Sequence, residues 1–374
     1  MRNVRMRFVL LALAAFGCGA EQGPPPECAV ESSRDMGALE QAAAIRGRDG
    51  GYSALLWERS VWLYGDTMLD VENEYGSRWL NNSWSWTQDG DASDGISGFV
   101  EPADAAGAPA ELLPQTAEER AFNLAHQGDA CQVEPCGARW ALWPGALAAD
   151  PERDRALVFY SKVYAEPGEW NFEGVGSSIA IWRGLDAQPE RPVVDAGAEH
   201  PTLLFGAGEP SFGSAALIED GLLYAYACGT DGLAKDCLLG RVPADRALER
   251  GAWRYYAGEE RGWVADWQQA EPVLEANDIL SVAYNRHLQA YLAVYSQPMD
   301  AKTMLRTAPR PEGPWSASLH AFDALPPEND TGWVYDALPH PELEQQEGRI
   351  QYVTYSRATG DFLSELRVVE LVLR

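Results

Sequence analysis

Asp49 and Asp66 are the residues whose type and spacing first suggest chemistry in this sequence. Asp49 stands just before one strand-like run, and Asp66 follows the next such run, Val61 to Gly65. In a β-hairpin these positions meet at the same end, on strands about 4.8 Å apart. Two carboxyl groups held close together raise the proton affinity of one of them. Glycoside hydrolysis uses such a pair, because one carboxyl protonates the leaving oxygen while the other acts ionised as nucleophile or base.

The alternative is a structural role for both aspartates. Aspartate next to threonine or glycine at a strand end often caps a turn by accepting backbone hydrogen bonds, and Asp49-Gly50-Gly51 is itself a turn sequence. The blade repeat described next argues against this alternative for Asp66, because its position is held by other residue types in the other four repeats. Those residues are Lys162, Cys228, Gln297 and Arg357.

The strand pattern that ends at Asp66 recurs along the chain. Each copy is an apolar, β-prone run that ends in tyrosine and a small residue, preceded by a polar turn and another short strand-like run. This pattern predicts a hairpin repeated five times. The five runs are Val61 to Gly65, Leu157 to Ser161, Leu223 to Ala227, Leu292 to Ser296 and Tyr352 to Ser356.

Third strands follow several of the hairpins, as at Ser178 to Trp182 and Leu366 to Leu373. Three or four antiparallel strands in each of five units predict an all-β fold, a five-bladed β-propeller, over residues 45–374. A two-sheet sandwich is the alternative, but it does not explain the regular return of one hairpin. An Ala-, Pro- and Glu-rich insertion near residues 100–122 is expected on the surface, with a helical flap as one form it could take.

Further candidates for a ligand site lie near the predicted inner strands. Asn82 could donate hydrogen bonds to a sugar or a carboxylate, and Glu209 could supply an acid from another blade. Asp336 and His340 could border the funnel. Each has a structural alternative: a strand edge for Asn82, an exposed loop for Glu209 and a packing role for His340. Trp143, Trp263 and Trp267 could stack on sugar rings, although core packing is the alternative for each of them.

The N-terminus predicts an export signal at residues 1–18. Basic residues precede an apolar run, Phe8 to Phe16, that is too short to span a bilayer, and Gly17-Cys18 resembles a cleavage point. Cys18 would then carry the lipid of a bacterial lipoprotein, with plain secretion as the alternative. Residues 19–44 are expected to form a tether. The protein would therefore lie at the outer membrane or cell surface, or be secreted.

Six cysteines agree with an oxidising compartment. The short spacings predict two disulfides, Cys131 with Cys136 and Cys228 with Cys237, and leave Cys28 without a partner. No histidines accompany the cysteines in a zinc-binding pattern, so we expect no metal and no cofactor, apart from a structural calcium ion that such propellers sometimes hold.

The net charge of -27 over 374 residues argues against nucleic acid or an anionic membrane surface as partner, because the required excess of Lys and Arg is missing. The chain holds 14 Trp and 15 Tyr, whose flat rings stack on sugars as readily as they fill cores. A neutral polysaccharide is therefore the expected partner, with membrane contact only through the lipid anchor, and we expect a monomer. The sequence contains no nucleophile elbow, phosphate loop or zinc-protease motif.

A set of short blocks follows in a fixed order along the chain. The blocks are Arg48 to Gly50, Trp62 to Thr67, Asn82-Ser83, Asp94 to Ile96, Trp253 to Tyr256, Leu280 to Asn285, Leu305 to Ala308, Gly313 to Ser316 and Tyr335 to Pro341. Together they resemble a bacterial family of domains of unknown function, some members of which are endo-D-arabinanases. The resemblance runs from about residue 45 to the end, and it implies a five-bladed propeller with Asp49 and Asp66 as the catalytic carboxylates in an axial funnel. The expected function is an exported glycoside hydrolase acting on arabinofuranose-containing polysaccharide. A non-catalytic propeller that binds glycans or envelope proteins is the alternative.

Overall fold

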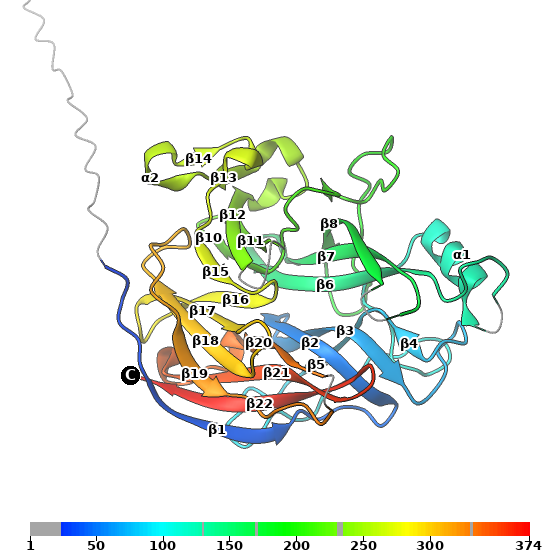
Figure 1. Ribbon diagram of the computed structural model, residues 1–374, viewed down its shortest axis with the longest axis horizontal. Coiled ribbons are helices and arrows are strands. Elements are labelled where there is room, and N and C mark those ends of the chain that lie inside the picture. The colour runs from blue at the N-terminus through cyan, green and yellow to red at the C-terminus, as the bar shows by residue number, and fades with distance from the viewer. Residues whose placement is uncertain (1–23, 129–130, 169–170, 230–234, 330–331) are drawn as a thin grey trace, which may run out of the picture.

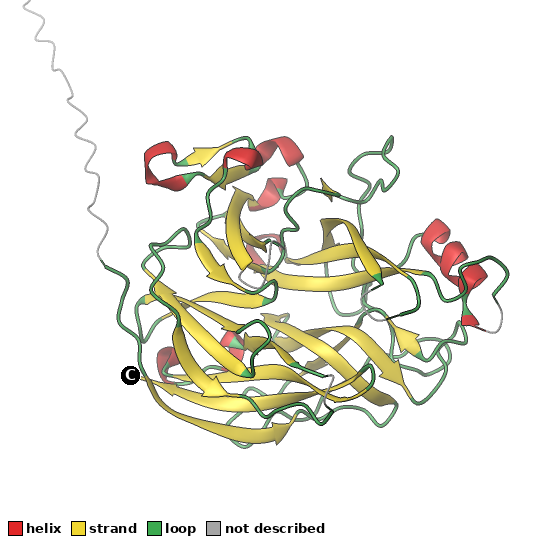
Figure 2. Ribbon diagram, viewed as in Figure 1, coloured by secondary structure: helices red, strands yellow, loops and turns green. Residues whose placement is uncertain are grey.

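The computed structural model describes residues 24–128, 131–168, 171–229, 235–329 and 332–374. Its strands form five sheets arranged in a ring, so the fold is the predicted five-bladed β-propeller (Figure 1). The two α-helices of the described residues are α1 (Ala117–His126) and α2 (Gly258–Arg261), and α1 stands apart from the sheets at one edge (Figure 2). The predicted export signal and Cys18 lie outside the described residues.

The blades follow one another along the chain, and each is built outward from an inner strand. Blade 1 contains β2 (Ile45–Leu56), β3 (Arg59–Leu69), β4 (Trp79–Leu80) and β5 (Ser83–Thr87). Blade 2 contains β6 (Arg139–Asp150), β7 (Arg155–Ala165), β8 (Phe172–Trp182) and β9 (Phe205–Gly206). Blade 3 contains β10 (Ala215–Glu219), β11 (Leu222–Cys228), β12 (Lys235–Pro243), β13 (Arg254–Tyr256), β14 (Trp263–Val264) and β15 (Leu274–Ala276).

Blade 4 contains β16 (Leu280–Asn285), β17 (Ala290–Ser296), β18 (Lys302–Ala308) and β19 (Leu319–Asp323). Blade 5 contains β20 (Val334–Pro339), β21 (Ile350–Gly360), β22 (Leu363–Leu373) and β1 (Val30–Ala38). Short 3-10 turns connect several strands: η2 (Pro151–Arg153), η3 (Ala244–Arg246), η4 (Arg250–Ala252), η5 (Trp267–Gln269), η6 (Pro341–Leu343) and η7 (Gln346–Gly348).

The ring is closed at two levels. The inner strands β2, β6, β10, β16 and β20 contact one another in that order, and β20 returns to β2. At the outside, β1 pairs with β22 in antiparallel fashion, so the first strand of the chain completes the last blade. The predicted tether of residues 19–44 is therefore wrong for residues 30–38. These residues form an edge strand with mostly exposed side chains. Backbone hydrogen bonds to β22 hold this strand in place, so its sequence needs no apolar pattern and gives little sign of a strand.

The core consists of a separate hydrophobic cluster between each pair of neighbouring blades. Every sheet thus has both faces covered, which explains why the second strands read as continuous apolar runs. The tyrosine that ends each run is buried, and its hydroxyl finds a partner outside the strand, as in Tyr64 with Ser85 Oγ and Tyr160 with Thr202 O. A buried tyrosine needs a hydrogen-bond partner for its hydroxyl group. The tyrosine therefore recurs because each blade places this hydroxyl group beside such a partner.

The insertion between blades 1 and 2 was predicted to lie on the surface, but part of it is buried. Leu112 and Leu113 are fully buried in the cluster between these blades, and Glu101 forms a buried ion pair with Arg48 at 2.8 Å. The helical part begins only at Thr116, whose side chain caps α1 in a reciprocal capping box with Glu119. The insertion is therefore partly core and partly helix.

Both expected disulfides, Cys131–Cys136 and Cys228–Cys237, are present. The second joins directly opposed residues of β11 and β12. Cys28 is free and packs against the cluster between blades 4 and 5, and burial raises the pKa of its thiol to about 11. Within the described residues, no helix has the length and apolar character that crossing a bilayer requires.

Candidate active site

A β-bulge brings Asp49 and Asp66 together. In the ladder between β2 and β3, Arg48 pairs with Thr67 and Gly50 pairs with Tyr64, so Asp49 alone faces both Gly65 and Asp66. A bulge of this kind interrupts the strict alternation of side chains and re-aims them. The charge of Asp66 acts on the carboxyl group of Asp49, and both residues are largely buried with only part of their surface exposed. The hairpin therefore makes the carboxylate pair that its sequence suggested.

The carboxyl group of Asp49 lies against the backbone of β3. A Cβ atom at Gly65 would lie 2.5 Å from Asp49 Oδ1, so only glycine allows this approach. Asp49 Oδ2 accepts a hydrogen bond from the Tyr335 hydroxyl at 3.0 Å. Burial, and then the charge of Asp66, raise the pKa of Asp49 to about 7, while the Tyr335 hydrogen bond opposes this rise. Asp49 is therefore positioned to hold a proton near neutral pH.

Asp66 has a more polar environment. Its Oδ1 accepts hydrogen bonds from Trp79 Nε1 at 3.0 Å and from Trp143 Nε1 at 3.3 Å. Burial raises the pKa of Asp66, but the charge of Arg139 and the two indole donors act in the opposite direction. Burial raises the pKa of both carboxyl groups, but a nearby positive charge, that of Arg139, opposes the rise only for Asp66, so the two carboxyl groups have unequal surroundings.

A third carboxyl group, that of Asp336, approaches from blade 5. Asp336 Oδ2 accepts hydrogen bonds from Gly50 N at 3.2 Å and from Ser356 Oγ at 3.3 Å. Its backbone has φ of 58°, and Gly50 has φ of 83°, so both strands depart from extended geometry where they meet. Burial and then the charges of Asp49 and Asp278 raise the pKa of Asp336 well above its usual range. Asp336 is buried and touches blade 1, next to Asp49.

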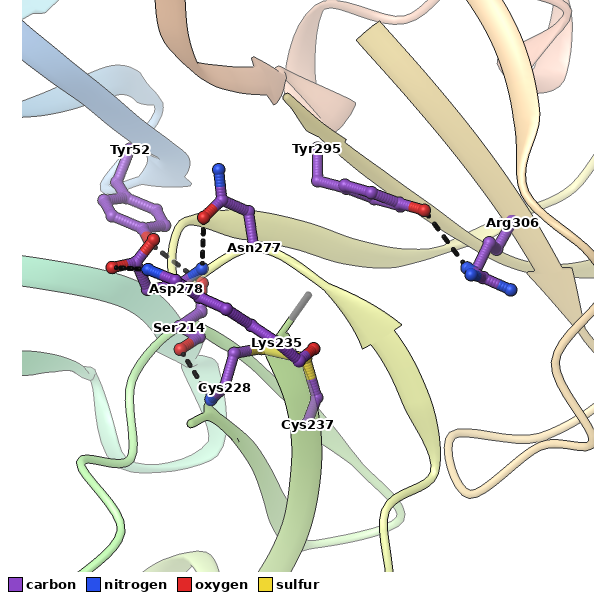
Figure 3. Close-up of a disulfide and its surroundings, with 9 residues drawn as sticks. All are labelled: Tyr52, Ser214, Cys228, Lys235, Cys237, Asn277, Asp278, Tyr295 and Arg306. Atoms are coloured by element: carbon purple, nitrogen blue, oxygen red, sulfur yellow. Dashed lines mark hydrogen bonds and ion pairs between the residues drawn. A yellow bond between two sulfur atoms is a disulfide. The ribbon is translucent and has the colours of Figure 1, made fainter. Parts of the chain in front are cut away.

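Tyr52, on the same strand as Asp49, links two blades that are not neighbours. Its hydroxyl donates a hydrogen bond to Ser214 O at 2.8 Å, which joins blade 1 to blade 3 although these blades are not neighbours. Figure 3 shows Tyr52 beside the ion pair of Lys235 with Asp278, whose atoms lie 2.5 Å apart, and near the disulfide of Cys228 with Cys237. Tyr52 is buried, so this link between blades 1 and 3 lies inside the protein.

Five predicted site residues lie away from the aspartate pair, and two of them, Asn82 and His340, are fully buried. Asn82 is fully buried: its Oδ1 accepts hydrogen bonds from Leu112 N and Leu113 N, and its Nδ2 donates to Leu142 O. His340 is also fully buried, stacks on Trp62 and bonds Ser53 Oγ and Thr354 Oγ1, and burial lowers its pKa to about 3. Neither residue is available to a ligand, because each side chain is enclosed and hydrogen-bonded within the protein.

Glu209 and two of the tryptophans also lie elsewhere. Glu209 pairs with Arg250 of η4 and accepts a hydrogen bond from Gly206 N. Trp263, on the outer strand β14, has Arg241 over its ring at 3.9 Å, and Trp267 packs against the cluster between blades 2 and 3. Of the three tryptophans, only Trp143 contacts the aspartate pair.

Three residues of the site were not predicted from the sequence: Tyr335, Trp79 and Arg139. Tyr335 stands directly before Asp336, and Trp79 follows the loop after Asp66, so chain proximity offered a weak signal for both. Arg139 lies at the start of β6 and packs over the Trp79 ring at 4.7 Å, a contact that depends on the packing of blade 2 against blade 1.

The described residues contain no group of three or more His, Cys, Asp or Glu side chains arranged to hold a metal ion. A cavity of about 150 Å³ is lined by Trp79 and Arg139, the two residues that act on Asp66, although Asp66 itself is not part of its lining. The site therefore consists of three aspartates from two blades, two indole donors, one tyrosine hydroxyl and an adjoining cavity.

The fold and this site define a five-bladed β-propeller with an acidic group of residues near its axis. Residues 167–360 match the domain of unknown function DUF4185, which is just over half of the chain, so the protein belongs to that family. The matched range contains the later of the blocks that resembled the family, whereas Asp49 and Asp66 precede it.

Two solved structures of similar fold are a candidate hydrolase from Bacteroides ovatus and an exo-β-1,3-galactanase from Clostridium thermocellum. The first has 16% sequence identity and a TM-score of 0.59, over 89% of this chain and 86% of its own. The second has 12% identity and a TM-score of 0.51, over 91% of this chain and 61% of the galactanase. At these identities the likeness concerns the fold. No protein with a curated description matches this chain.

Proposed function

We propose that this protein is an exported glycoside hydrolase that cleaves a furanose-containing polysaccharide, with arabinofuranose as the expected sugar. The observation that carries the proposal is the pair formed by Asp49 and Asp66 at the bulge of blade 1, with unequal surroundings. The galactanase of similar fold supports it as an example of a glycoside hydrolase built on this architecture. Export, with Cys18 as the lipid-bearing residue, is part of the proposal.

In the proposed reaction Asp49 is the general acid. Its carboxyl proton passes to the glycosidic oxygen as the bond from that oxygen to the anomeric carbon breaks. Asp66 is ionised, and it either attacks the anomeric carbon or takes a proton from the attacking water. Trp79 and Trp143 hold Oδ1 of Asp66 in place, which leaves Oδ2 for the reaction. Tyr335 and Gly65 fix the position of Asp49.

The test is hydrolysis of arabinans and other furanosides by the wild-type protein, Asp49→Asn and Asp66→Asn, measured as release of reducing ends. Both variants are expected to lose at least 100-fold in kcat while keeping the wild-type far-UV circular dichroism spectrum. A substrate cleaved equally well by all three proteins would overturn the assignment of the pair. Binding of a glycan without cleavage by the wild-type protein would instead favour a non-catalytic, glycan-binding propeller.

A further inference from the structure

The cavity at Trp79 and Arg139 is lined by residues of the loop after β3, the insertion, helix α1 and the start of β6. Two of its lining residues also act on Asp66: Trp79 donates a hydrogen bond to Oδ1, and the charge of Arg139 opposes the rise in the pKa of that carboxyl that burial causes. An occupant of the cavity would therefore sit one residue away from the reacting carboxylate. We propose that this cavity is a subsite that binds one neutral sugar unit of the polysaccharide. The inference rests on the proposed function and names where the substrate is recognised.

The first argument is the unused hydrogen-bonding capacity of two arginines. Arg120 lies over the Tyr75 ring at 4.0 Å, and within the described residues its guanidinium makes no hydrogen bond or ion pair. Arg139 uses Nε to bond Asn81 Oδ1 at 3.0 Å and has no ion pair in the described part of the chain. The charge of Arg120 acts on Glu111 and that of Arg139 acts on Asp66, but neither arginine forms a direct ion pair in the described part of the chain, so their remaining N–H groups are available to the oxygen atoms of a ligand.

The second argument is the carboxyl group of Glu111, which also lines the cavity. Gln115 Nε2 lies 3.1 Å and 3.3 Å from its two oxygens, which fixes the carboxyl group toward the cavity. Burial raises the pKa of Glu111 to about 7, although the charge of Arg120 opposes this rise. Glu111 therefore accepts hydrogen bonds from hydroxyl groups, and in its protonated form it donates one. The arginine donors and the Glu111 acceptor in one cavity fit a ring that carries several hydroxyl groups.

The third argument is that the wall of the cavity is fixed before any ligand binds. Asn123 of α1 donates to Trp140 O at 2.9 Å and accepts from Trp140 N at 2.7 Å, which ties the helix to β6. Glu119 of the same helix forms buried ion pairs with Lys162 at 2.7 Å and Arg191 at 2.6 Å. A preformed site loses less conformational entropy on binding, as subsites for sugars require.

Size and charge specify the ligand. A volume of about 150 Å³ is below the roughly 300 Å³ at which pockets begin to hold drug-sized molecules, so the cavity suits one ring and not an oligosaccharide. Glu111 in the cavity wall disfavours an anionic sugar, as does the net charge of -27. A neutral sugar unit is the remaining fit.

The test is binding of arabinotetraose, xylotetraose, galactotetraose and tetragalacturonate to the protein carrying Asp66→Asn, measured by isothermal titration calorimetry. We expect at least one neutral oligosaccharide to bind, and Glu111→Gln and Arg120→Gln each to weaken that binding roughly 10-fold or more, as the loss of a charged hydrogen bond predicts. Arg78→Gln is the matched control, because Arg78 is exposed and lies outside the cavity, and it should bind like its parent.

Three outcomes would overturn the subsite. They are no binding of any of the four oligosaccharides, unchanged affinity in both Glu111→Gln and Arg120→Gln, and tighter binding of tetragalacturonate than of the neutral oligosaccharides. The two variants come from different segments, so misfolding of one leaves the other as the test. If binding depends on Glu111 and Arg120 but the wild-type protein cleaves none of the neutral oligosaccharides, the subsite stands and the proposed hydrolysis fails.

Discussion

The hydroxyl group of Tyr335 lies 3.0 Å from Oδ2 of Asp49 and joins the inner strand of blade 5 to that of blade 1. The same hydroxyl lies 3.0 Å from Ser364 Oγ. Because Tyr335 donates to the carboxylate, it favours the ionised form of Asp49 and opposes the burial that raises the pKa of Asp49 to about 7. One hydroxyl group therefore adjusts the proton affinity of the candidate general acid.

Tyr335→Phe should raise the pKa of Asp49 by about one unit, because a hydrogen bond to a charged group is worth about 1.5–3 kcal/mol and one unit corresponds to about 1.4 kcal/mol. The alkaline limb of the pH profile of kcat/KM, where Asp49 loses its proton, should move to higher pH. Carbon-13 NMR titration of the Asp49 carboxyl measures the same shift without substrate. Ser364→Ala keeps the bond from Tyr335 to Asp49 and is the control. An unchanged titration in Tyr335→Phe would contradict the role of Tyr335.

Gly65→Ala should displace the Asp49 carboxyl group, because the new Cβ would lie 2.5 Å from Oδ1. We expect a fall in kcat of about 100-fold, since small displacements of a catalytic group are costly, and a loss of stability of about 1–3 kcal/mol from overpacking. Gly174→Ala in β8 is the matched control, because no atom lies within 4 Å of its added Cβ. Equal activity of the two variants would show that the position of Asp49 does not depend on Gly65.

The stability of the protein should fall as pH rises from about 4 to 8. Burial raises the pKa values of Asp49 and Asp336 in the folded state above their unfolded values near 3.9. The folded state then binds protons more tightly, so their contribution to stability is fully present below about pH 4 and is lost as pH rises through the folded pKa, about 7 for Asp49. Urea denaturation at several pH values measures this trend.

Asp49→Asn should flatten the dependence of stability on pH between about 4 and 7, because asparagine carries no titrating proton. The same variant lacks the negative charge that raises the pKa of Asp336, so the pKa of Asp336 should fall toward its usual range. If the stability of Asp49→Asn changes with pH in parallel with that of the wild-type protein, Asp49 is not the source of the pH dependence.

The repeated hairpins could be predicted from the sequence because strands buried on both faces give continuous apolar runs with a fixed tyrosine. The edge strand β1 could not be predicted, since its exposed residues follow no apolar pattern and backbone pairing with β22 holds it. At the site, the hairpin rule placed Asp49 and Asp66 together. Asn82 and His340 were misassigned because a polar residue near a predicted funnel looks the same whether it faces solvent or a buried partner.

The contacts made by Arg139 and Tyr335 depend on how neighbouring blades pack. Arg139 reaches Trp79 from blade 2, and Tyr335 reaches Asp49 from blade 5. Such contacts carry no periodic signal in a single sequence, because the two residues of each pair are far apart in the chain and belong to different repeats.

Glu119→Gln should destabilise the protein by about 3–5 kcal/mol, because it leaves two buried cations, Lys162 and Arg191, without a charged partner. Lys162→Met should cost less, since Arg191 still bonds both oxygens of Glu119, at 2.6 Å and 3.0 Å. Burial acts to raise the pKa of Glu119, but the hydrogen bond and the charge of Arg191, together with the hydrogen bond from Lys162, lower this pKa to about 2. Its stabilising contribution is therefore present above about pH 4 and lost as pH falls toward 2.

Denaturation with urea at pH 7 and pH 3 tests this ordering of the two variants. The gap in stability between wild type and Glu119→Gln should narrow at pH 3, whereas a purely steric defect would persist at both pH values. Because Glu119 anchors α1, and α1 forms one wall of the cavity at Trp79 and Arg139, the variant should also weaken sugar binding without touching the ligand. A larger loss of stability in Lys162→Met than in Glu119→Gln would show that Glu119 is not the centre of this buried network.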